Sequence, residues 1–209
     1  MKHFATPAMS IDKLARRKFV LMPFENEWKD LIGTPECAGS WIIYGNSGNG
    51  KTTFSLLLLK YMTKFKKCAY LPLEEGTKLT FKQAVQRANL VSVSSKVKIW
   101  DNYTMQDLDA ELPKPKSPDV IFIDSLQYMR MHAKSPNQLT SFEYLDLLKR
   151  YPKKLFIFIS HAKSGEPKGA LAESVYFGSD VCLYVDDFTV YPKKSRYGGK
   201  VVFEINNQK

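Results

Sequence analysis

The stretch "YGNSGNGKTTF", Tyr44 to Phe54, places three glycines, one lysine and two threonines between two apolar runs. Gly45, Gly50, Lys51 and Thr52 fit the spacing G-x-x-x-x-G-K-[ST], the Walker A pattern. The run "SWIIY" before it predicts a buried strand, and the run "TTFSLLLLKYMTKF" after it predicts a helix. The N–H groups and the dipole at a helix N-terminus attract anions. The stretch therefore predicts a strand, a phosphate-binding loop and a helix.

The residue types in this loop suit a nucleoside triphosphate. Glycines let the backbone wrap a phosphate without a Cβ in the way. Lys51 can reach the β- and γ-phosphates, and the Thr52 hydroxyl can coordinate Mg²⁺. A glycine turn with a solvated lysine is the alternative interpretation. The residues expected to contact the nucleotide are Gly45, Asn46, Ser47, Gly48, Asn49, Gly50, Lys51, Thr52 and Thr53.

Length, composition and charge limit the class of protein. A chain of 209 residues with 44% hydrophobic residues is expected to form a globular core. It has neither a run of eighteen apolar residues nor an N-terminal secretory signal, and Cys37, Cys68 and Cys182 fit no metal or disulfide pattern. We therefore expect a cytoplasmic protein without a membrane span. The net charge of +10, from 31 Lys and Arg against 21 Asp and Glu, suggests a polyanionic partner, with nucleic acid the first candidate. A soluble basic protein without such a partner is the alternative.

Apolar strands alternate with amphipathic helices along the chain. This order predicts an α/β fold in which helices cover both faces of a mostly parallel sheet. A basic, irregular lead-in is expected over residues 1–34 and a single core over 35–209. A late β-hairpin is expected over 189–205, with Gly198 and Gly199 near its turn. The other expected strands are 40–44, 67–75, 96–100, 119–126 and 154–161, and the expected helices are 51–65, 78–90, 104–112 and 140–151.

Carboxylates follow two of the expected strands. Asp124 ends the apolar run "VIFID", where a Walker B aspartate would hold Mg²⁺ directly or through water. A strand-ending aspartate that caps the next turn is the alternative. Glu74 and Glu75 end the strand that follows the loop helix, where one of them could deprotonate an attacking water. Helix-start acids would look the same, and periodicity does not choose between the two glutamates.

These motifs in this order resemble the RecA-like ATPases, and among them the RadA, DnaB-helicase and KaiC group. The resemblance covers roughly residues 35–206. It implies that Glu74 matches the group's catalytic glutamate, and that Gln83 and Arg87 match a following acid–Gln–Arg helix. His161, in "IFISHAKSGEPKGA", falls where the group keeps a polar residue that senses the γ-phosphate. Residues 164–170 fall where these proteins carry a flexible DNA-contacting loop. The stretch "KKSRYGG" resembles a K-x-R-x-G hairpin, so that Lys194 and Arg196 match the pair that reaches into a neighbouring subunit's nucleotide.

The resemblance implies a three-layer α/β/α RecA-like P-loop fold and ATP with Mg²⁺ as ligands. A core without flanking domains is similar to short phage recombinases. It implies a DNA-stimulated ATPase that acts in recombination, repair or replication, assembled as a homo-oligomeric ring or filament on single-stranded DNA. Two other functions stay open. One is a KaiC-like regulator whose nucleotide state controls a protein partner, and the other is a helicase loader or scaffold with little ATP turnover.

Overall fold

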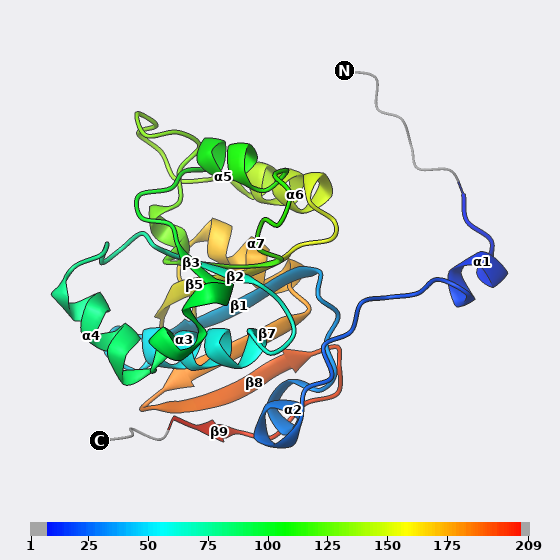
Figure 1. Cartoon of the computed structure of the whole chain (residues 1–209), viewed down its shortest axis with the longest axis horizontal. Coiled ribbons are helices and arrows are strands. Elements are labelled where there is room, and N and C mark those ends of the chain that lie inside the picture. Colours follow the sequence, from blue (N-terminus) through cyan, green and yellow to red (C-terminus); the bar gives the residue numbers. More distant parts are fainter. Residues whose placement is uncertain (1–7, 206–209) are drawn as a thin grey trace.

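A mixed β-sheet runs through the centre of the computed structural model, which describes residues 8–205 (Figure 1). In that range the sheet has nine strands, in the order β3-β2-β4-β5-β1-β7-β8-β9, with β6 paired to β5. The strands from β3 to β7 in this order are parallel, and β8 and β9 are antiparallel additions. The strands are β1 (Gly39–Gly45), β2 (Cys68–Pro72), β3 (Val97–Ile99), β4 (Val120–Asp124), β5 (Leu155–Lys163), β6 (Glu166–Pro167), β7 (Val181–Asp186), β8 (Thr189–Ser195) and β9 (Phe203–Glu204).

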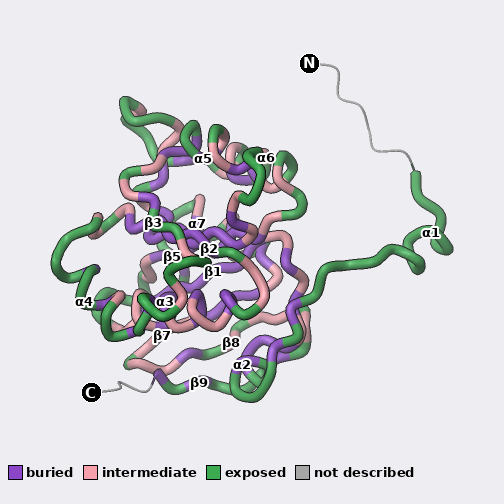
Figure 2. The backbone as a smooth tube through the Cα atoms, viewed as in Figure 1, coloured by how far each residue is buried: buried purple, intermediate pink, exposed green. Residues whose placement is uncertain are grey.

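Helices cover both faces of the sheet, as the sequence predicts. Buried side chains of α2, α3 and α4 pack on one face, and those of α5, α6 and α7 pack on the other (Figures 1 and 2). Thr104 and Thr140 begin α5 and α6 with capping boxes, in which Asp107 and Glu143 return the hydrogen bond. The helices are α1 (Ile11–Ala15), α2 (Asn26–Ile32), α3 (Lys51–Met62), α4 (Leu79–Arg87), α5 (Met105–Glu111), α6 (Ser141–Arg150) and α7 (Ala170–Gly178), with 3₁₀ turns η1 (Leu90–Lys96) and η2 (Leu126–Tyr128).

The central strands are apolar throughout because both of their faces are covered. In β1, Trp41 and Ile43 face one helix layer, while Ile42 and Tyr44 face the other. All four side chains are at most 1% exposed. This pattern is typical of a parallel sheet between two helix layers. Among the helices of residues 8–205, none combines the length and the apolar content that crossing a lipid bilayer would take.

The tight turn of the C-terminal hairpin lies between β7 and β8, and not near Gly198 and Gly199 as expected. Strand β7 returns into β8 through Asp187 and Phe188, which both adopt positive φ angles. The expected pairing of β8 with β9 exists, but it joins only two residue pairs. The connection through Gly198 and Gly199 crosses to α2, where the Lys200 N–H donates to the Asp30 carbonyl over 2.9 Å. Contact with α2 therefore shapes this segment more than strand pairing does.

The N-terminal lead-in is only partly irregular. Its first described part, with α1, projects from the body and is exposed (Figures 1 and 2). From Met22 onward the chain joins the core, and Trp28, Leu31 and Ile32 of α2 are buried. These apolar residues stand among charged neighbours in "FENEWKDLI", which hides their periodicity in the sequence. Residues 1–7 of the lead-in and residues 206–209 of the expected core lie outside the described range.

Candidate functional site

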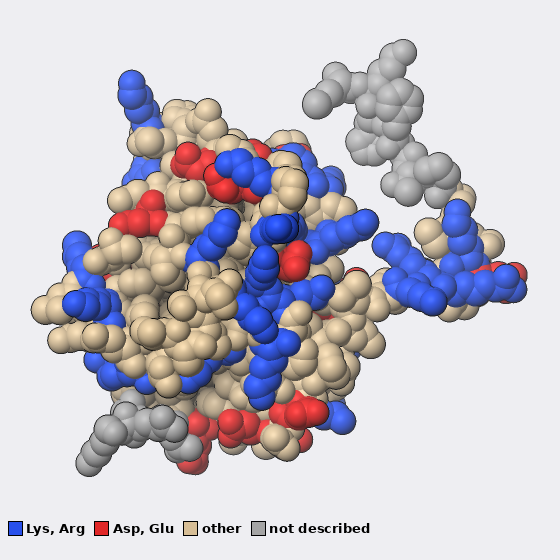
Figure 3. Space-filling view, viewed as in Figure 1, with Lys and Arg blue, Asp and Glu red and all other residues tan. Residues whose placement is uncertain are grey.

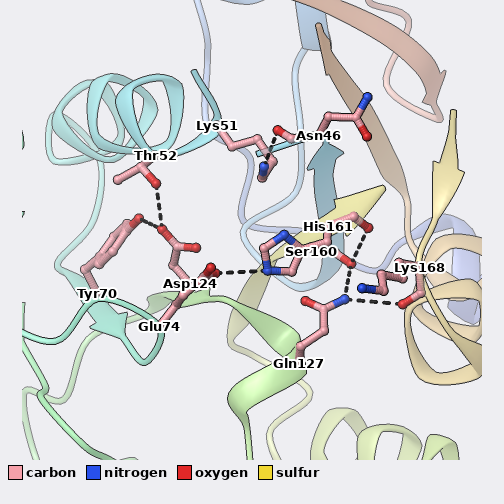
Figure 4. Close-up of polar contacts among 10 residues, drawn as sticks. All are labelled: Asn46, Lys51, Thr52, Tyr70, Glu74, Asp124, Gln127, Ser160, His161 and Lys168. Atoms are coloured by element: carbon pink, nitrogen blue, oxygen red, sulfur yellow. Dashed lines mark hydrogen bonds and ion pairs between the residues drawn. The ribbon is translucent and has the colours of Figure 1, made fainter. Parts of the chain in front are cut away.

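The glycine-rich stretch forms a loop between β1 and the N-terminus of α3, as its sequence predicts. Lys51 is the first residue of the helix and is 9% exposed. Its Nζ donates to the carbonyl oxygen of Asn46 over 2.7 Å, so the ammonium lies across the mouth of the loop (Figure 4). A phosphate oxygen that enters the loop would replace the Asn46 carbonyl as the acceptor for this ammonium, and it would also accept from the N–H groups of the first helical turn.

Two glycines of the motif are required by the residues packed against them. A Cβ on Gly45 would lie 2.1 Å from the carbonyl oxygen of Val185 on β7. Gly50 has a φ of +97°, and a Cβ there would lie 2.9 Å from the Phe188 ring. The β7–β8 turn therefore packs directly against the loop. Asn49 ties the two together, because its carbonyl accepts from the Phe188 N–H over 3.2 Å.

The strand order brings the other predicted residues beside the loop. Strands β2, β4, β5 and β1 are neighbours in that order, and their carboxyl ends share one edge. Asp124 ends β4 and accepts from the Thr52 hydroxyl over 3.1 Å. The Tyr70 hydroxyl on β2 donates to the same carboxylate oxygen over 2.5 Å (Figure 4). Thr52 and Asp124 are thus adjacent hard oxygen donors, as a Mg²⁺ site requires.

Burial dominates the charge state of this site. It raises the pKa of the Asp124 carboxyl from 3.8 to about 6, although the hydrogen bonds from Tyr70 and Thr52 oppose the rise. Burial likewise lowers the pKa of the Lys51 ammonium, and the carboxylates of Asp124 and Glu74 oppose that fall. Nucleotide phosphates and a cation would replace part of the lost solvation. Asp124 and Lys51 alone do not compensate each other's burial, and a Mg²⁺ ion and nucleotide phosphates would supply the missing charge partners.

Glu74 and His161 are in contact with each other beside the phosphate loop, and both line the cavity described below. Oε2 of Glu74 lies 3.1 Å from Nε2 of His161, which follows the buried part of β5 (Figure 4). The Glu74 N–H also donates to the Asp124 carbonyl over 3.1 Å, which fixes the start of its turn. Glu75 lines the cavity too, but only Glu74 forms the contact with His161. The structure therefore brings together the predicted base and the predicted γ-phosphate sensor.

One cavity of about 260 Å³ joins these groups. Among residues 8–205, no three His, Cys, Asp or Glu side chains form a metal cluster by themselves. Mg²⁺ in proteins is often held by one or two side chains together with substrate phosphates, and Thr52 and Asp124 suit that mode. The lining residues are Ser47, Gly48, Gly50, Lys51, Thr52, Thr53, Glu74, Glu75, Thr80, Ala84, Arg87, Asp124, His161 and Phe188.

Lys194 and Arg196 lie at the opposite edge of the sheet from this cavity. Ser195 pairs with Val181, which pairs with Trp41 near the beginning of β1, whereas the loop follows the end of β1. Four residues of β1, about 13 Å, separate Trp41 from Gly45, and two strand spacings, about 10 Å, separate β8 from β1. The two side chains therefore do not reach the phosphate loop of their own chain.

The local contacts of these two residues differ. Nζ of Lys194 donates to the carbonyls of Tyr176 and Phe177 at the end of α7, over 2.9 and 3.2 Å. Arg196 pairs with Asp180 over 3.1 Å, and its side chain is still 62% exposed. Lys194 thus has a local role at a helix C-terminus, while Arg196 stays accessible.

The stretch 164–170, expected as a flexible loop, folds back on β5. Strand β6 pairs with Ala162 and Lys163 of β5 in a tight hairpin. The side chain of Gln127 holds this hairpin, since its Nε2 donates to the Ser160 hydroxyl over 2.8 Å and to the Lys168 carbonyl over 3.3 Å (Figure 4). Lys163 and Lys168 remain exposed.

Sequence reasoning missed Tyr70, Phe188 and Gln127 as parts of this site. Tyr70 stands in the middle of a buried apolar strand, where a hydroxyl needs a partner. That partner, Asp124, is 54 residues away in the chain. A polar group within a buried strand was the available signal, but only the pairing of β2 with β4 shows what it serves.

No family model and no curated protein sequence matches this chain. Among solved structures it is similar to the flagellar accessory protein FlaH from Methanocaldococcus jannaschii, with a TM-score of 0.64 and 14% identity over 90% of this chain and 96% of that chain. It is also similar to a solved ATPase domain of a second protein, with a TM-score of 0.58 and 17% identity over 80% of this chain and 81% of that chain. These similarities confirm the predicted three-layer α/β RecA-like P-loop fold. At such identities they establish the fold alone.

Proposed function

We propose that this chain binds and hydrolyses ATP, and that it works as a DNA-dependent ATPase assembled on single-stranded DNA. The observation that supports the ATPase most strongly is that Lys51, Thr52, Asp124 and Glu74 line one cavity at a helix N-terminus. These four residues come from three separate segments of the chain. Burial disfavours the charged forms of Asp124 and Lys51, so these residues do not serve the stability of the fold. Buried charged groups that meet in a cavity are typical of a functional site.

Each residue has a role that its position supports. Lys51 would contact the β- and γ-phosphates together with the loop N–H groups. Thr52 and Asp124 would hold Mg²⁺, which neutralises charge that develops on the transferring phosphoryl group. Glu74 would orient the attacking water and accept its proton. His161, which already contacts Glu74, would register the γ-phosphate.

The location of Arg196 supports a role in a neighbouring subunit. An arginine that reaches a phosphoryl group from another subunit can raise the rate by about 10³ to 10⁵. Arg196 is accessible and far from its own loop, so a ring or a filament that stacks one edge of the sheet on the other would use it. Support for Lys194 is weaker, because its ammonium already binds the end of α7.

The charge of the chain supports a nucleic-acid partner. The net charge is +10, and Lys163 and Lys168 are exposed on the β5–β6 hairpin that follows His161. Contact of this hairpin with a phosphate backbone would connect DNA to the γ-phosphate sensor through Gln127 and Ser160. We place such an activity in recombination, repair or replication.

A second candidate is a nucleotide-controlled regulator or loader with little turnover. The contact between Glu74 and His161 favours it, because a carboxylate engaged by a histidine is less available to water. The fold is also shared with FlaH, which is an accessory protein by its own description. In this case nucleotide binding would persist, while DNA would leave hydrolysis unchanged.

The test measures ATP binding and steady-state hydrolysis with and without single-stranded DNA. Lys51→Ala should lose nucleotide binding. Glu74→Gln should keep binding and lose most hydrolysis, because an amide cannot accept the proton. Glu75→Gln is the matched control, since it lines the same cavity without the His161 contact, and its loss should be smaller. Hydrolysis by Lys51→Ala at the wild-type rate would contradict the proposal. Turnover that ignores DNA would favour the second candidate.

A further inference from the structure

Four strands of the sheet begin side by side at the edge away from the phosphate loop. Cys68 of β2 pairs with both Val97 of β3 and Val120 of β4, and Val120 pairs with Leu155 of β5. Adjacent strands lie about 4.8 Å apart, so these four first residues span roughly 14 Å. The segments that enter the four strands therefore form one continuous border.

This border is hollowed and basic. A cleft of about 620 Å³ opens between the segments that precede the strands. Asp119 is the one acidic residue among its lining residues. Figure 3 shows Lys and Arg side chains in a band across the face turned to the viewer. We call this site the lysine cleft, and its basic residues are Lys66, Lys67, Lys96, Lys114, Lys116 and Lys154.

Two of these six lysines serve the fold, and a third, Lys114, is paired with Glu111. Nζ of Lys154 donates to the Ser117 hydroxyl over 2.8 Å and to the Pro118 carbonyl over 2.8 Å. Nζ of Lys96 donates to the Thr63 carbonyl over 2.9 Å. These bonds join segments that enter different strands, so they hold the walls of the cleft.

Three other lysines have no such role. Across residues 8–205, the side chains of Lys66, Lys67 and Lys116 make no hydrogen bond and no ion pair. The backbone of Lys66 and Lys67 is nevertheless held, because the Lys66 N–H donates to the Met62 carbonyl over 3.0 Å and the Lys67 carbonyl accepts from the N–H groups of Asp119 and Val120 over 2.9 and 3.2 Å. Like charges held close together repel each other and oppose the compact state. A bound anion would offset this repulsion.

We propose that the lysine cleft is a binding surface for a single strand of nucleic acid, separate from the ATP cavity. The cleft lysines precede four adjacent strands whose first residues span roughly 14 Å, and charges spread over that width suit a chain of phosphates better than a lone phosphate, which needs groups that converge on one point. The site is a hollow lined by six lysines, which admits a strand, whereas binding at a lipid surface uses an exposed apolar helix face beside the basic residues. Phe65 lines the cleft as well, but its ring already packs on Phe24 and Tyr61, so the lysines carry the proposal.

This proposal does not depend on ATP turnover, since the cleft lies at the other edge of the sheet from Lys51. It goes beyond the hairpin contact at Lys163 and Lys168 by adding a second site for the strand. Each site is tested by its own substitutions, so one site can be disproved while the other is retained.

The experiment measures binding of a fluorescein-labelled oligothymidylate to the full chain by anisotropy over a salt series. The cleft variant combines Lys66→Gln, Lys67→Gln and Lys116→Gln. The control variant combines Lys29→Gln, Lys82→Gln and Lys149→Gln, which are exposed residues outside the cleft, and it removes the same three charges. With about 0.7 counterions released per contact, the cleft variant should reduce the salt slope by about 2 and weaken binding by about 100-fold at 0.1 M salt. The control should bind within a few-fold of the wild type.

Further arms decide the outcome. Basal ATP hydrolysis of the cleft variant should equal that of the wild type, which separates this proposal from the proposed function. If the triple variant unfolds, the double variant Lys67→Gln/Lys116→Gln changes only exposed residues and should lose about 25-fold. Equal losses in the cleft and control variants would overturn the proposal. So would loss only in Lys163→Gln/Lys168→Gln, or preference of the wild type for phosphatidylserine vesicles or polyglutamate over the oligonucleotide.

Discussion

Replacing Asp124 by asparagine should stabilise the metal-free protein while it destroys the Mg²⁺ site. Asp124 is a buried residue, 9% exposed, and its carboxylate accepts hydrogen bonds from Tyr70 and Thr52. Burial nevertheless raises its pKa from 3.8 to about 6. At neutral pH the folded protein therefore carries an ionised group that its surroundings disfavour. An asparagine keeps the shape and one acceptor oxygen without the charge.

The size of the effect follows from the pKa difference between the folded and unfolded chains. A rise from 3.8 to about 6 corresponds to about 3 kcal/mol at neutral pH, at 1.36 kcal/mol for each pKa unit. This is an upper limit, because an amide oxygen accepts more weakly than a carboxylate from the hydroxyls of Tyr70 and Thr52. For a chain of this length, 1 kcal/mol shifts the melting temperature by about 2–4 °C, so Asp124→Asn should melt up to about 6–12 °C higher.

The dependence on pH has a definite sign. The folded pKa of Asp124 is raised, so protonation of this group favours the folded state below pH 3.8, and that contribution is lost as the pH rises through about 6. The advantage of Asp124→Asn should therefore be full above pH 6 and should vanish toward about pH 4, where the wild-type carboxyl is protonated. Urea unfolding in a chelating buffer, followed by tryptophan fluorescence at several pH values, measures this difference.

Two further measurements test whether burial disfavours the Asp124 carboxylate. Tyr70→Phe removes a donor to the buried carboxylate and should lower the free energy of unfolding by about 1.5–3 kcal/mol at neutral pH. Addition of Mg²⁺ and ATP should stabilise the wild type and leave Asp124→Asn nearly unchanged. If Asp124→Asn is less stable than the wild type in metal-free buffer at neutral pH, then the carboxylate is not disfavoured by burial and the argument fails.

The remaining predictions concern the loop and the assembly. Gly45→Ala should lower the free energy of unfolding by about 1–3 kcal/mol, because its Cβ would lie 2.1 Å from the Val185 carbonyl oxygen, and an unchanged urea midpoint would show that β7 moves aside freely. Arg196→Ala and Lys51→Ala should each be nearly inactive alone, but a mixture should recover part of the ATPase activity, since some interfaces then combine an intact loop with an intact arginine. Specific activity that is flat with protein concentration, together with no recovery in the mixture, would leave Arg196 as a partner of Asp180 only.

The sequence by itself determined the local features of this protein. The glycines, Lys51 and Thr52 specify a strand, a loop and a helix, because each of these depends on residues a few positions apart. The apolar strands between amphipathic helices specify a parallel sheet with two helix layers. Acidic residues after β2 and β4 were placed at one edge of the sheet, because parallel strands share the direction in which they end.

Tertiary structure alone decided which of these pieces are neighbours. Strand β5 lies between β1 and β4, which brings His161 to Glu74, and β2 lies beside β4, which brings Tyr70 to Asp124. The order of strands depends on how crossovers and helices pack over long sequence separations, and the local period of a sequence does not record it. The docking of α2 on the sheet and the position of Arg196 away from its own loop are also tertiary, whereas charged neighbours hide the apolar period of α2 in the sequence. The tertiary structure also gathers lysines from four separate segments into one cleft, although in the sequence they are scattered charges.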